Sequence, residues 1–264
     1  MPETKAIEDE AKSELIGSEE EEPIIAYRRK NIRFSIGLNG GFSYANRTLE
    51  SKNTASEDLF GQRERYEKQL ETSHLGVQLT AEHESGFSLT SGLQFTRMVE
   101  LYERNEVVEI MDTVIGVAYY SVLPNNDTVP VMGEVPHLTI NTLRKRYYNK
   151  YTMLDIPLLA GFRYENNNWT IGGQAGVFAN ISINTEGRIL MDEIEEQELK
   201  EIIKTNIGLS YYAGLSVGYL LNENIEISVS PYGRYFSKSF TKDDYGLSQK
   251  YLLVGLDARF RYWF

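Results

Sequence analysis

The chain has 264 residues, a formal net charge of -11 and no cysteine, together with 18 tyrosines and 21 glycines. The absence of cysteine excludes a disulfide framework, a thiolate metal site and a cysteine nucleophile, and the acidic excess argues against a nucleic-acid partner, which requires clustered Lys and Arg. No stretch approaches the roughly 18 apolar residues of a membrane-spanning helix, whereas the mean hydropathy of -0.38 is compatible with a β-barrel, because alternate residues of a barrel face its interior.

Residues 1–30 are acidic and poor in large apolar side chains, with four consecutive glutamates, Glu19 to Glu22, before Pro23. This composition predicts a disordered leader or linker or, alternatively, an acidic interaction tail. The segment lacks the apolar stretch of a signal peptide, so for an exported protein we expect that a signal was removed or that the chain is cut from a longer one. The folded domain is expected over residues 31–264.

From Asn31 onward, apolar and polar residues alternate with the period of two that is typical of β-strands. In the last stretch, seven alternate residues from Leu252 to Phe264 are apolar, while Asp257, Arg259 and Arg261 fall on the other face. The same alternation predicts eight strands, at residues 32–44, 74–82, 87–96, 154–164, 169–181, 209–219, 225–235 and 251–264.

The links between these strands alternate between long and short. Short turns are expected at 83–86, 165–168 and 222–224, and they must all lie at one end of the sheet, with four long loops at the other. This asymmetry predicts an all-β fold, an eight-stranded antiparallel up-and-down transmembrane β-barrel with long extracellular loops. Within the loop at 103–146 we expect a separate hairpin that includes residues 107–122, and within the loop at 186–205 a short helix near 192–204.

Residues 151–164, with the core Asp-Ile-Pro-Leu-Leu at 155–159, resemble the fourth strand of the PorT-like outer-membrane β-barrel family. The glycine-alternating first strand and the Arg-Tyr-Trp-Phe ending at 261–264 agree with this resemblance, which covers residues 31–264. It implies a location in the outer membrane of a Gram-negative bacterium and contact with outer-membrane lipid. It also implies that the barrel assembly machinery reads the aromatic end, Tyr262 and Phe264, as an assembly signal during insertion.

The strand pattern places charged residues on the inner face of the barrel. These residues are Arg33, Glu82, Asp155, Arg163, Glu226, Arg234, Asp257, Arg259 and Arg261. Because an eight-stranded barrel is filled by its own side chains and unpaired buried charge is costly, we expect a lumen plugged by paired charges; the alternative is a regulated conductance pathway. Asp155 and Arg234 are expected in another layer, about 20 Å above the low layer near the periplasmic mouth. The low layer is expected to hold Arg33, Glu82, Arg163, Glu226, Arg259 and Arg261.

Outward-facing aromatic residues gather near the two ends of the strands, as in the girdles of membrane barrels. The expected membrane-interface aromatics are Tyr44, Tyr164, Trp169, Tyr211, Tyr219, Tyr235 and Tyr251.

The three histidines are poorly placed for catalysis. His74 is expected to face the lumen near its loop end, where a triad with a serine and Glu67 or Glu71 is conceivable but has no supporting motif. His83 falls in a short turn, and His137 with Glu134 is too small a set for a metal site. We therefore predict no catalytic, cofactor-binding or metal-binding residues and no enzyme activity.

The predicted function is a structural or interaction scaffold that presents its extracellular loops to other envelope proteins, above all through 103–146 and 186–205. The longest loop is a candidate for an aromatic recognition surface; the alternative is that it only covers the barrel mouth. The tyrosines in and beside it are Tyr102, Tyr119, Tyr120, Tyr147 and Tyr148. The alternatives are a small porin-like channel for ions or small solutes and a soluble lipocalin-type lipid carrier, in which the apolar alternate residues would point inward.

Overall fold

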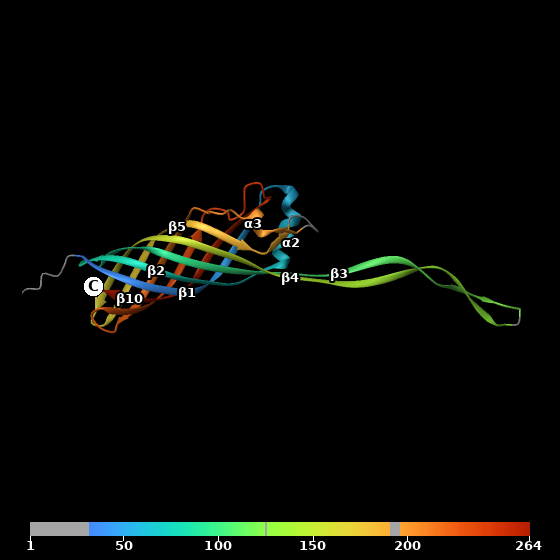
Figure 1. Ribbon diagram of the computed structural model, residues 1–264, viewed down its shortest axis with the longest axis horizontal. Helices are drawn as coiled ribbons and strands as arrows, with labels where there is room; N and C mark the ends of the chain where they lie inside the picture. The colour runs from blue at the N-terminus through green and yellow to red at the C-terminus, as the bar shows by residue number, and fades with distance from the viewer. Residues whose placement is uncertain (1–31, 125, 191–195) are drawn as a thin grey trace, which may run out of the picture. The chain divides into compact units, whose positions relative to one another are not determined.

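The computed structural model describes residues 32–124, 126–190 and 196–264, so the leader expected at 1–30 lies outside the described residues (Figure 1). The strands are β1 (Ile32–Ser51), β2 (Glu67–His83), β3 (Phe87–Val122), β4 (Thr128–Asn166), β5 (Trp169–Glu186), β6 (Arg188–Leu190), β7 (Glu196–Glu198), β8 (Leu209–Leu220), β9 (Ile225–Phe236) and β10 (Leu247–Trp263). The helices are the 3-10 turn η1 (Thr54–Ser56), α2 (Glu57–Tyr66) and α3 (Leu199–Ile202).

Within the described residues, eight strands form a closed antiparallel barrel in the order β1-β10-β9-β8-β5-β4-β3-β2. The short strands β6 and β7 form a separate two-stranded hairpin between β5 and β8. Every barrel strand therefore pairs with its neighbours in chain order, and β10 closes the ring on β1. The predicted eight-stranded up-and-down barrel is confirmed.

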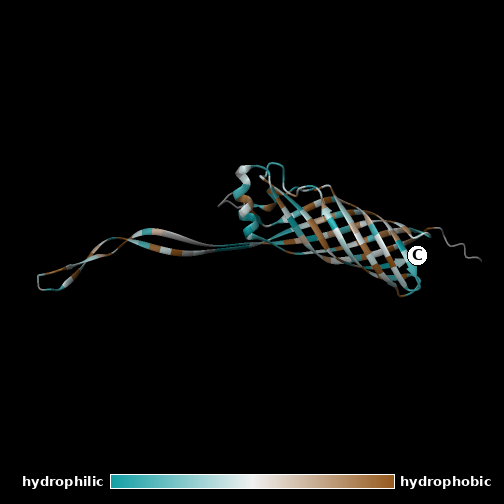
Figure 2. Cartoon of the chain, turned by 180° about the vertical axis from the view of Figure 1, so that it is seen from behind, coloured by the Kyte–Doolittle hydropathy of each residue, from teal (hydrophilic) through white to brown (hydrophobic). Residues whose placement is uncertain are grey.

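The alternation of each strand separates an apolar outer surface from a polar interior, seen in Figure 2 as bands of differing hydropathy along the strands. On β10, Phe260 is 45% exposed, whereas Asp257 and Arg259 are 2% and 4% exposed. Leu256 and Ile156 likewise point outward. The lipocalin-type alternative is wrong, because a lipocalin requires these apolar side chains inside.

The three short turns lie where the sequence predicts them, and one of them depends on a glycine. Gly86 has a φ of +89°, and a Cβ atom there would lie 2.2 Å from the carbonyl oxygen of Arg163. Its own carbonyl accepts a hydrogen bond of 2.9 Å from the Arg163 amide. Glycine thus allows the β2–β3 turn to pack against β4.

We expected β3 and β4 to end with the barrel. Both strands instead continue beyond it as a two-stranded ribbon (Figure 1). The two strands stay paired from the barrel to the tip of the ribbon, from Glu103 opposite Arg146 to Val122 opposite Thr128. The register shifts once, between Val117 and Tyr119. The expected hairpin is therefore an extension of the barrel strands, because β-branched and aromatic residues keep both chains extended. We call residues 103–122 and 128–146 the β3–β4 ribbon.

The other long links also contain more structure than expected. β1 continues to Ser51, and α2 and the start of β2 occupy the stretch treated as a polar loop. β10 begins at Leu247, inside the loop expected at 238–249, and α3 covers only 199–202 of the helix expected near 192–204, of which 192–195 lie outside the described residues. None of the described helices is long and apolar enough to cross a membrane.

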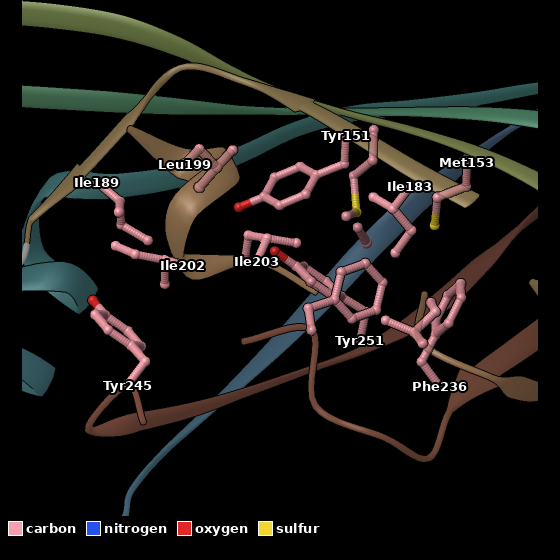
Figure 3. Packing of buried hydrophobic residues seen from close by; sticks show 14 of the residues in the cluster. Tyr151, Met153, Ile183, Ile189, Leu199, Ile202, Ile203, Phe236, Tyr245 and Tyr251 are labelled. Carbon is pink, nitrogen blue, oxygen red and sulfur yellow. The ribbon is translucent and has the colours of Figure 1, made fainter. Parts of the chain in front are cut away.

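The main apolar core lies at the loop end of the barrel (Figure 3). Loop residues Ile189, Leu199, Ile202 and Ile203 pack there with barrel residues that include Tyr151. Leu59 and Phe60 of α2 pack against the same cluster. We call this cluster, together with α2 and α3, the cap, since it covers the barrel interior from the loop end.

Candidate functional site: the barrel interior and the β3–β4 ribbon

At the short-turn end of the interior, Glu82 lies between two arginines. Arg33 and Glu82 are direct cross-strand partners on β1 and β2, with 3.0 Å between Nη2 and Oε1. Arg163 of β4 donates to both carboxylate oxygens of Glu82, from Nε at 2.9 Å and Nη2 at 2.8 Å. Such two-point contacts fix the guanidinium plane as well as its charge.

Glu226 extends this network across the barrel. Its Oε2 accepts hydrogen bonds from Arg163 at 3.2 Å, Arg261 at 3.3 Å and the Trp263 indole at 3.2 Å, while Thr170 donates to Oε1 at 3.1 Å. We call the set Arg33, Glu82, Arg163, Glu226 and Arg261 the basal network.

The ring of Trp263 lies under three guanidinium groups of the basal network. The distances from the ring centroid to the Cζ atoms of Arg33, Arg163 and Arg261 are 4.5, 4.8 and 5.1 Å. A tryptophan face attracts cations, so Trp263 offsets the excess of three arginines over two glutamates.

A second group surrounds Asp257 in the middle of the barrel. Its Oδ1 is 2.8 Å from His74 Nε2 and accepts from Asn39 Nδ2 at 3.1 Å, and its Oδ2 is 3.3 Å from Arg259 Nη2. The Tyr232 hydroxyl lies 3.3 Å from the other ring nitrogen of His74. His74 thus faces the interior and is held by an aspartate on one side and a tyrosine on the other.

Asp155 and Arg234 form a separate buried ion pair, with 2.8 Å between Oδ2 and Nη2. Asn180 donates to Asp155 at 2.8 Å, and Arg234 donates from Nε to Ser210 at 2.8 Å. The Arg234 guanidinium lies 4.3 Å from the ring centroid of Phe178. All nine charged residues predicted for the lumen line the interior, Arg33 at its more exposed rim.

A fourth charged group, at the loop end, was not predicted. Arg63 of α2 is completely buried and contacts Glu67 through Nε at 2.9 Å and Nη2 at 2.8 Å. Its Nη2 also donates to Gln249 at 2.8 Å. Arg47 forms a second ion pair with Glu67 and lies 3.7 Å from Glu100. We call Arg47, Arg63, Glu67 and Glu100 the outer network.

Electrostatics keep Arg63 and Glu67 of the outer network charged although both are buried. Burial lowers the pKa of the Arg63 guanidinium, but Glu67 and the neighbouring tyrosines Tyr245 and Tyr151 together outweigh burial and raise that pKa overall. Burial raises the pKa of Glu67, and the ion pairs with Arg63 and Arg47 nevertheless bring it below its ordinary value. The Arg63–Glu67 contact therefore anchors α2 to the first residue of β2.

Tyr251 is a correction to the predicted girdles. It is 1% exposed and points into the barrel, where its hydroxyl donates to Glu100 at 2.7 Å, beside the Tyr151 hydroxyl at 2.9 Å from the same carboxylate. The physical reason is the period of two, since odd-numbered residues of β10 face inward. The remaining predicted aromatics point outward, namely Tyr44, Tyr164, Trp169, Tyr211, Tyr219 and Tyr235.

The other predicted positions lie on exposed surfaces. His83 is in the first short turn next to Ser85, His137 is on the β3–β4 ribbon opposite Asp112, and Tyr262 and Phe264 point outward. No group of three or more His, Asp or Glu side chains with metal-binding geometry occurs among the described residues.

The β3–β4 ribbon exposes large apolar side chains on both strands. On β3 these include Met111 and Ile115, which are 76% and 78% exposed, and Tyr120. On β4 they include Met132 and Ile140. Large apolar side chains exposed together on one element are a feature of interaction sites, so the ribbon is the second part of the candidate site.

No protein-family model and no curated protein matches this sequence. The chain is similar to the solved outer membrane protease OmpT from Escherichia coli, at 11% identity and a TM-score of 0.40, over 92% of this chain and 99% of that one. It is also similar to Neisserial surface protein A (9%, TM-score 0.34, 85% and 95% covered) and to OprG from Pseudomonas aeruginosa (11%, TM-score 0.35, 87% and 95% covered). These values carry no substrate or partner over to this chain, and the PorT-like resemblance stays a prediction.

Proposed function

We propose that this chain is an integral outer-membrane β-barrel of a Gram-negative bacterium that acts as a scaffold, without catalysis, and holds the β3–β4 ribbon outside the membrane. The observation that carries the proposal is a belt of exposed apolar side chains around a barrel with a buried charged interior. Each barrel strand contributes to this belt, for example Leu38, Leu79, Leu93, Leu158, Ile171, Leu215, Val229 and Leu256. In water a belt of this size would drive aggregation, and in lipid it is satisfied.

The belt has the height that a bilayer requires. On β1 the outward residues from Phe34 to Tyr44 are apolar apart from Gly40. These 11 positions span about 25 Å along the barrel axis when a strand is tilted by about 40°, and the apolar band of membrane barrels is about 25 Å tall. The proposed partners of this surface are outer-membrane lipid and, through Tyr262 and Phe264, the barrel assembly machinery.

The interior supports a scaffold rather than a channel. The basal network, the Asp257 group, the Asp155–Arg234 pair and the outer network place paired charges along the lumen, and the cap covers its loop end. We expect no steady conductance when the chain is reconstituted in planar bilayers. A stable conductance of uniform size would instead favour the porin-like alternative.

The belt is tested with a charged residue placed on it. Leu256→Arg puts a guanidinium in the middle of the belt, where it costs about 2 to 4 kcal/mol, so we expect poor insertion into lipid vesicles. The matched control is Thr48→Arg, an outward position of β1 beyond the belt, which should insert like the unaltered chain. Insertion is measured as protection of the barrel from added protease, and equal insertion of both variants would refute the membrane location.

A further inference from the structure

The two edges of the β3–β4 ribbon differ in their ability to pair with a further strand. To compare them, we first determine which residues of β4 point their backbone N–H and C=O groups toward the free edge. The Arg163 amide donates to Gly86, directly before β3, so the backbone of Arg163 faces β3. Backbone groups of successive residues in an antiparallel strand point to opposite sides, and β4 has no bulge against β3. The even-numbered residues of β4 therefore direct their backbone groups away from β3.

Prolines block the β4 edge. Pro130 and Pro136 are both even-numbered, so their nitrogen atoms face the free edge of β4, where a proline cannot donate to an added strand. β3 contains neither proline nor lysine along its whole length. Strand edges exposed to water are usually protected from further pairing by such residues. The ribbon therefore has one protected edge, on β4, and one open edge, on β3.

The open edge of β3 runs from Met111 to Val122. Beyond Tyr102, no strand of the described residues pairs with this side of β3. Residues 110–122 contain a single charged residue, Asp112, and Met111, Ile115 and Tyr120 are strongly exposed. A two-stranded ribbon is only marginally stable in water, and three or more strands are needed for stability.

We propose that the open edge of β3 pairs antiparallel with the same edge of a second copy of this chain, about a two-fold axis at Val114. This register places Val114 opposite itself and Met111 opposite Val117. It also places Asp112 opposite Gly116 rather than opposite the other Asp112, which avoids facing like charges. The inference rests on the proposed function, in which the ribbon is held clear of the membrane.

The arrangement also explains why the partner is a second copy. Pairing of two β3 edges gives a four-stranded sheet in the order β4-β3-β3-β4, whose outer edges are both the β4 edges with Pro130 and Pro136. Assembly therefore stops at two chains, as a closed two-fold interface requires. An extended peptide from another protein would instead leave its own far edge open.

The chain has no cysteine, so single cysteines test the register directly. Val114→Cys places two thiols at a non-hydrogen-bonded pair with a Cα separation of about 4.5 Å, within the range of a disulfide. We expect oxidation in detergent micelles to give a cross-linked dimer. The matched control is Val135→Cys, the direct partner of Val114 on β4, which should not form a cross-link although the chain still pairs through β3. Equal cross-linking of the two variants would overturn the proposal.

Proline substitutions test the edge without the cross-link. Ile115→Pro removes an N–H that faces the open edge and leaves the β3–β4 pairing intact, so we expect dimerisation to weaken at least about tenfold. Thr142→Pro makes the same change at an even-numbered position of β4 and should leave the dimer unaltered. The mass in micelles is measured by light scattering, and an unaltered chain that is monomeric at high concentration would refute the inference.

Failure of this inference is distinguishable from failure of the proposed function. A chain that inserts into vesicles but stays monomeric contradicts only the pairing of two ribbons. A chain that dimerises in detergent but does not insert contradicts the membrane location, on which the placement of the ribbon rests.

Discussion

His74 on β2 and Asp257 on β10 belong to strands that do not pair with each other, yet their side chains meet at 2.8 Å across the intervening strand β1. Both residues are register partners of Gly41. A Cβ atom at Gly41 would lie 2.8 Å from His74 Cε1 and 2.1 Å from the carbonyl oxygen of Leu256. The missing side chain at Gly41 is therefore what lets the two residues meet.

Gly41→Ala is expected to destabilise the barrel by about 2 to 3 kcal/mol, because the added methyl group overpacks the interior against backbone. The free energy of unfolding is measured by urea titration in lipid vesicles. Gly61→Ala in α2 is the control, since a Cβ atom there meets nothing within 4 Å and alanine favours a helix. Similar losses of stability for both variants would contradict the view that the missing side chain at Gly41 lets His74 and Asp257 meet.

Glu226→Ala is expected to cost about 3 kcal/mol, because it leaves the buried guanidinium groups of Arg163 and Arg261 without their shared acceptor. Glu165, by contrast, is an exposed partner of Arg33 and Arg163 at 3.3 and 3.2 Å. Glu165→Ala should cost less than about 1 kcal/mol. The same urea titration compares the two, and a small loss for Glu226→Ala would show that the basal network adds little to stability.

Tyr251→Phe is expected to cost about 1 to 2 kcal/mol, because the buried carboxylate of Glu100 loses one of its two tyrosine donors. Tyr235→Phe removes a hydroxyl of the same kind from the outer surface and should change the free energy of unfolding by less than about 0.5 kcal/mol. A larger loss of stability for Tyr235→Phe than for Tyr251→Phe would contradict the position of Tyr251 inside the barrel.

Acidification is expected to release α2 before the barrel unfolds. The ion pairs of Glu67 hold its pKa below the ordinary 4.5 despite burial. A group with a lowered pKa contributes stability above its unfolded pKa and loses that contribution as the pH falls through the folded value. Hydrogen-exchange protection factors of the α2 amides should therefore fall as the pH drops below the ordinary 4.5.

The amide protection of α2 is a better measure of this effect than the global free energy of unfolding. Glu100 responds in the opposite sense, since burial raises its pKa, so global stability combines two opposing changes while α2 reports the Arg63–Glu67 contact. Glu67→Gln should lower α2 protection near neutral pH and remove most of its pH dependence. Constant protection of α2 in the unaltered chain would count against this anchoring role.

The barrel strands could be predicted from the sequence because an apolar outer surface and a polar interior impose a strict period of two. The same pattern indicated the inward charges, from Arg33 to Arg261, since a charge can lie only on the inner face. Tyr251 went wrong because its residue type was given more weight than its odd-numbered position beside Asp257 and Arg259.

The ribbon and the outer network could not be predicted in the same way. Both faces of the ribbon are exposed, so the alternation that marks a barrel strand is absent there. Glu67 lies beyond the belt beside Lys68 and Gln69, where inner and outer positions are both polar. Glu100 follows the apolar outer positions of β3, but its partners are distant in sequence. The one available signal was the spacing of Arg63 and Glu67, since residues four apart face each other on a helix.

The first and last strands of the barrel pair with each other, as Leu38 with Phe260 shows. The ring therefore cannot close until the C-terminal strand has been synthesised, and until then both β1 and the newest strand present unpaired edges. Contacts between such distant parts of a chain form slowly. In the proposed outer-membrane location, this chain therefore needs protection from aggregation for as long as its synthesis and transport last.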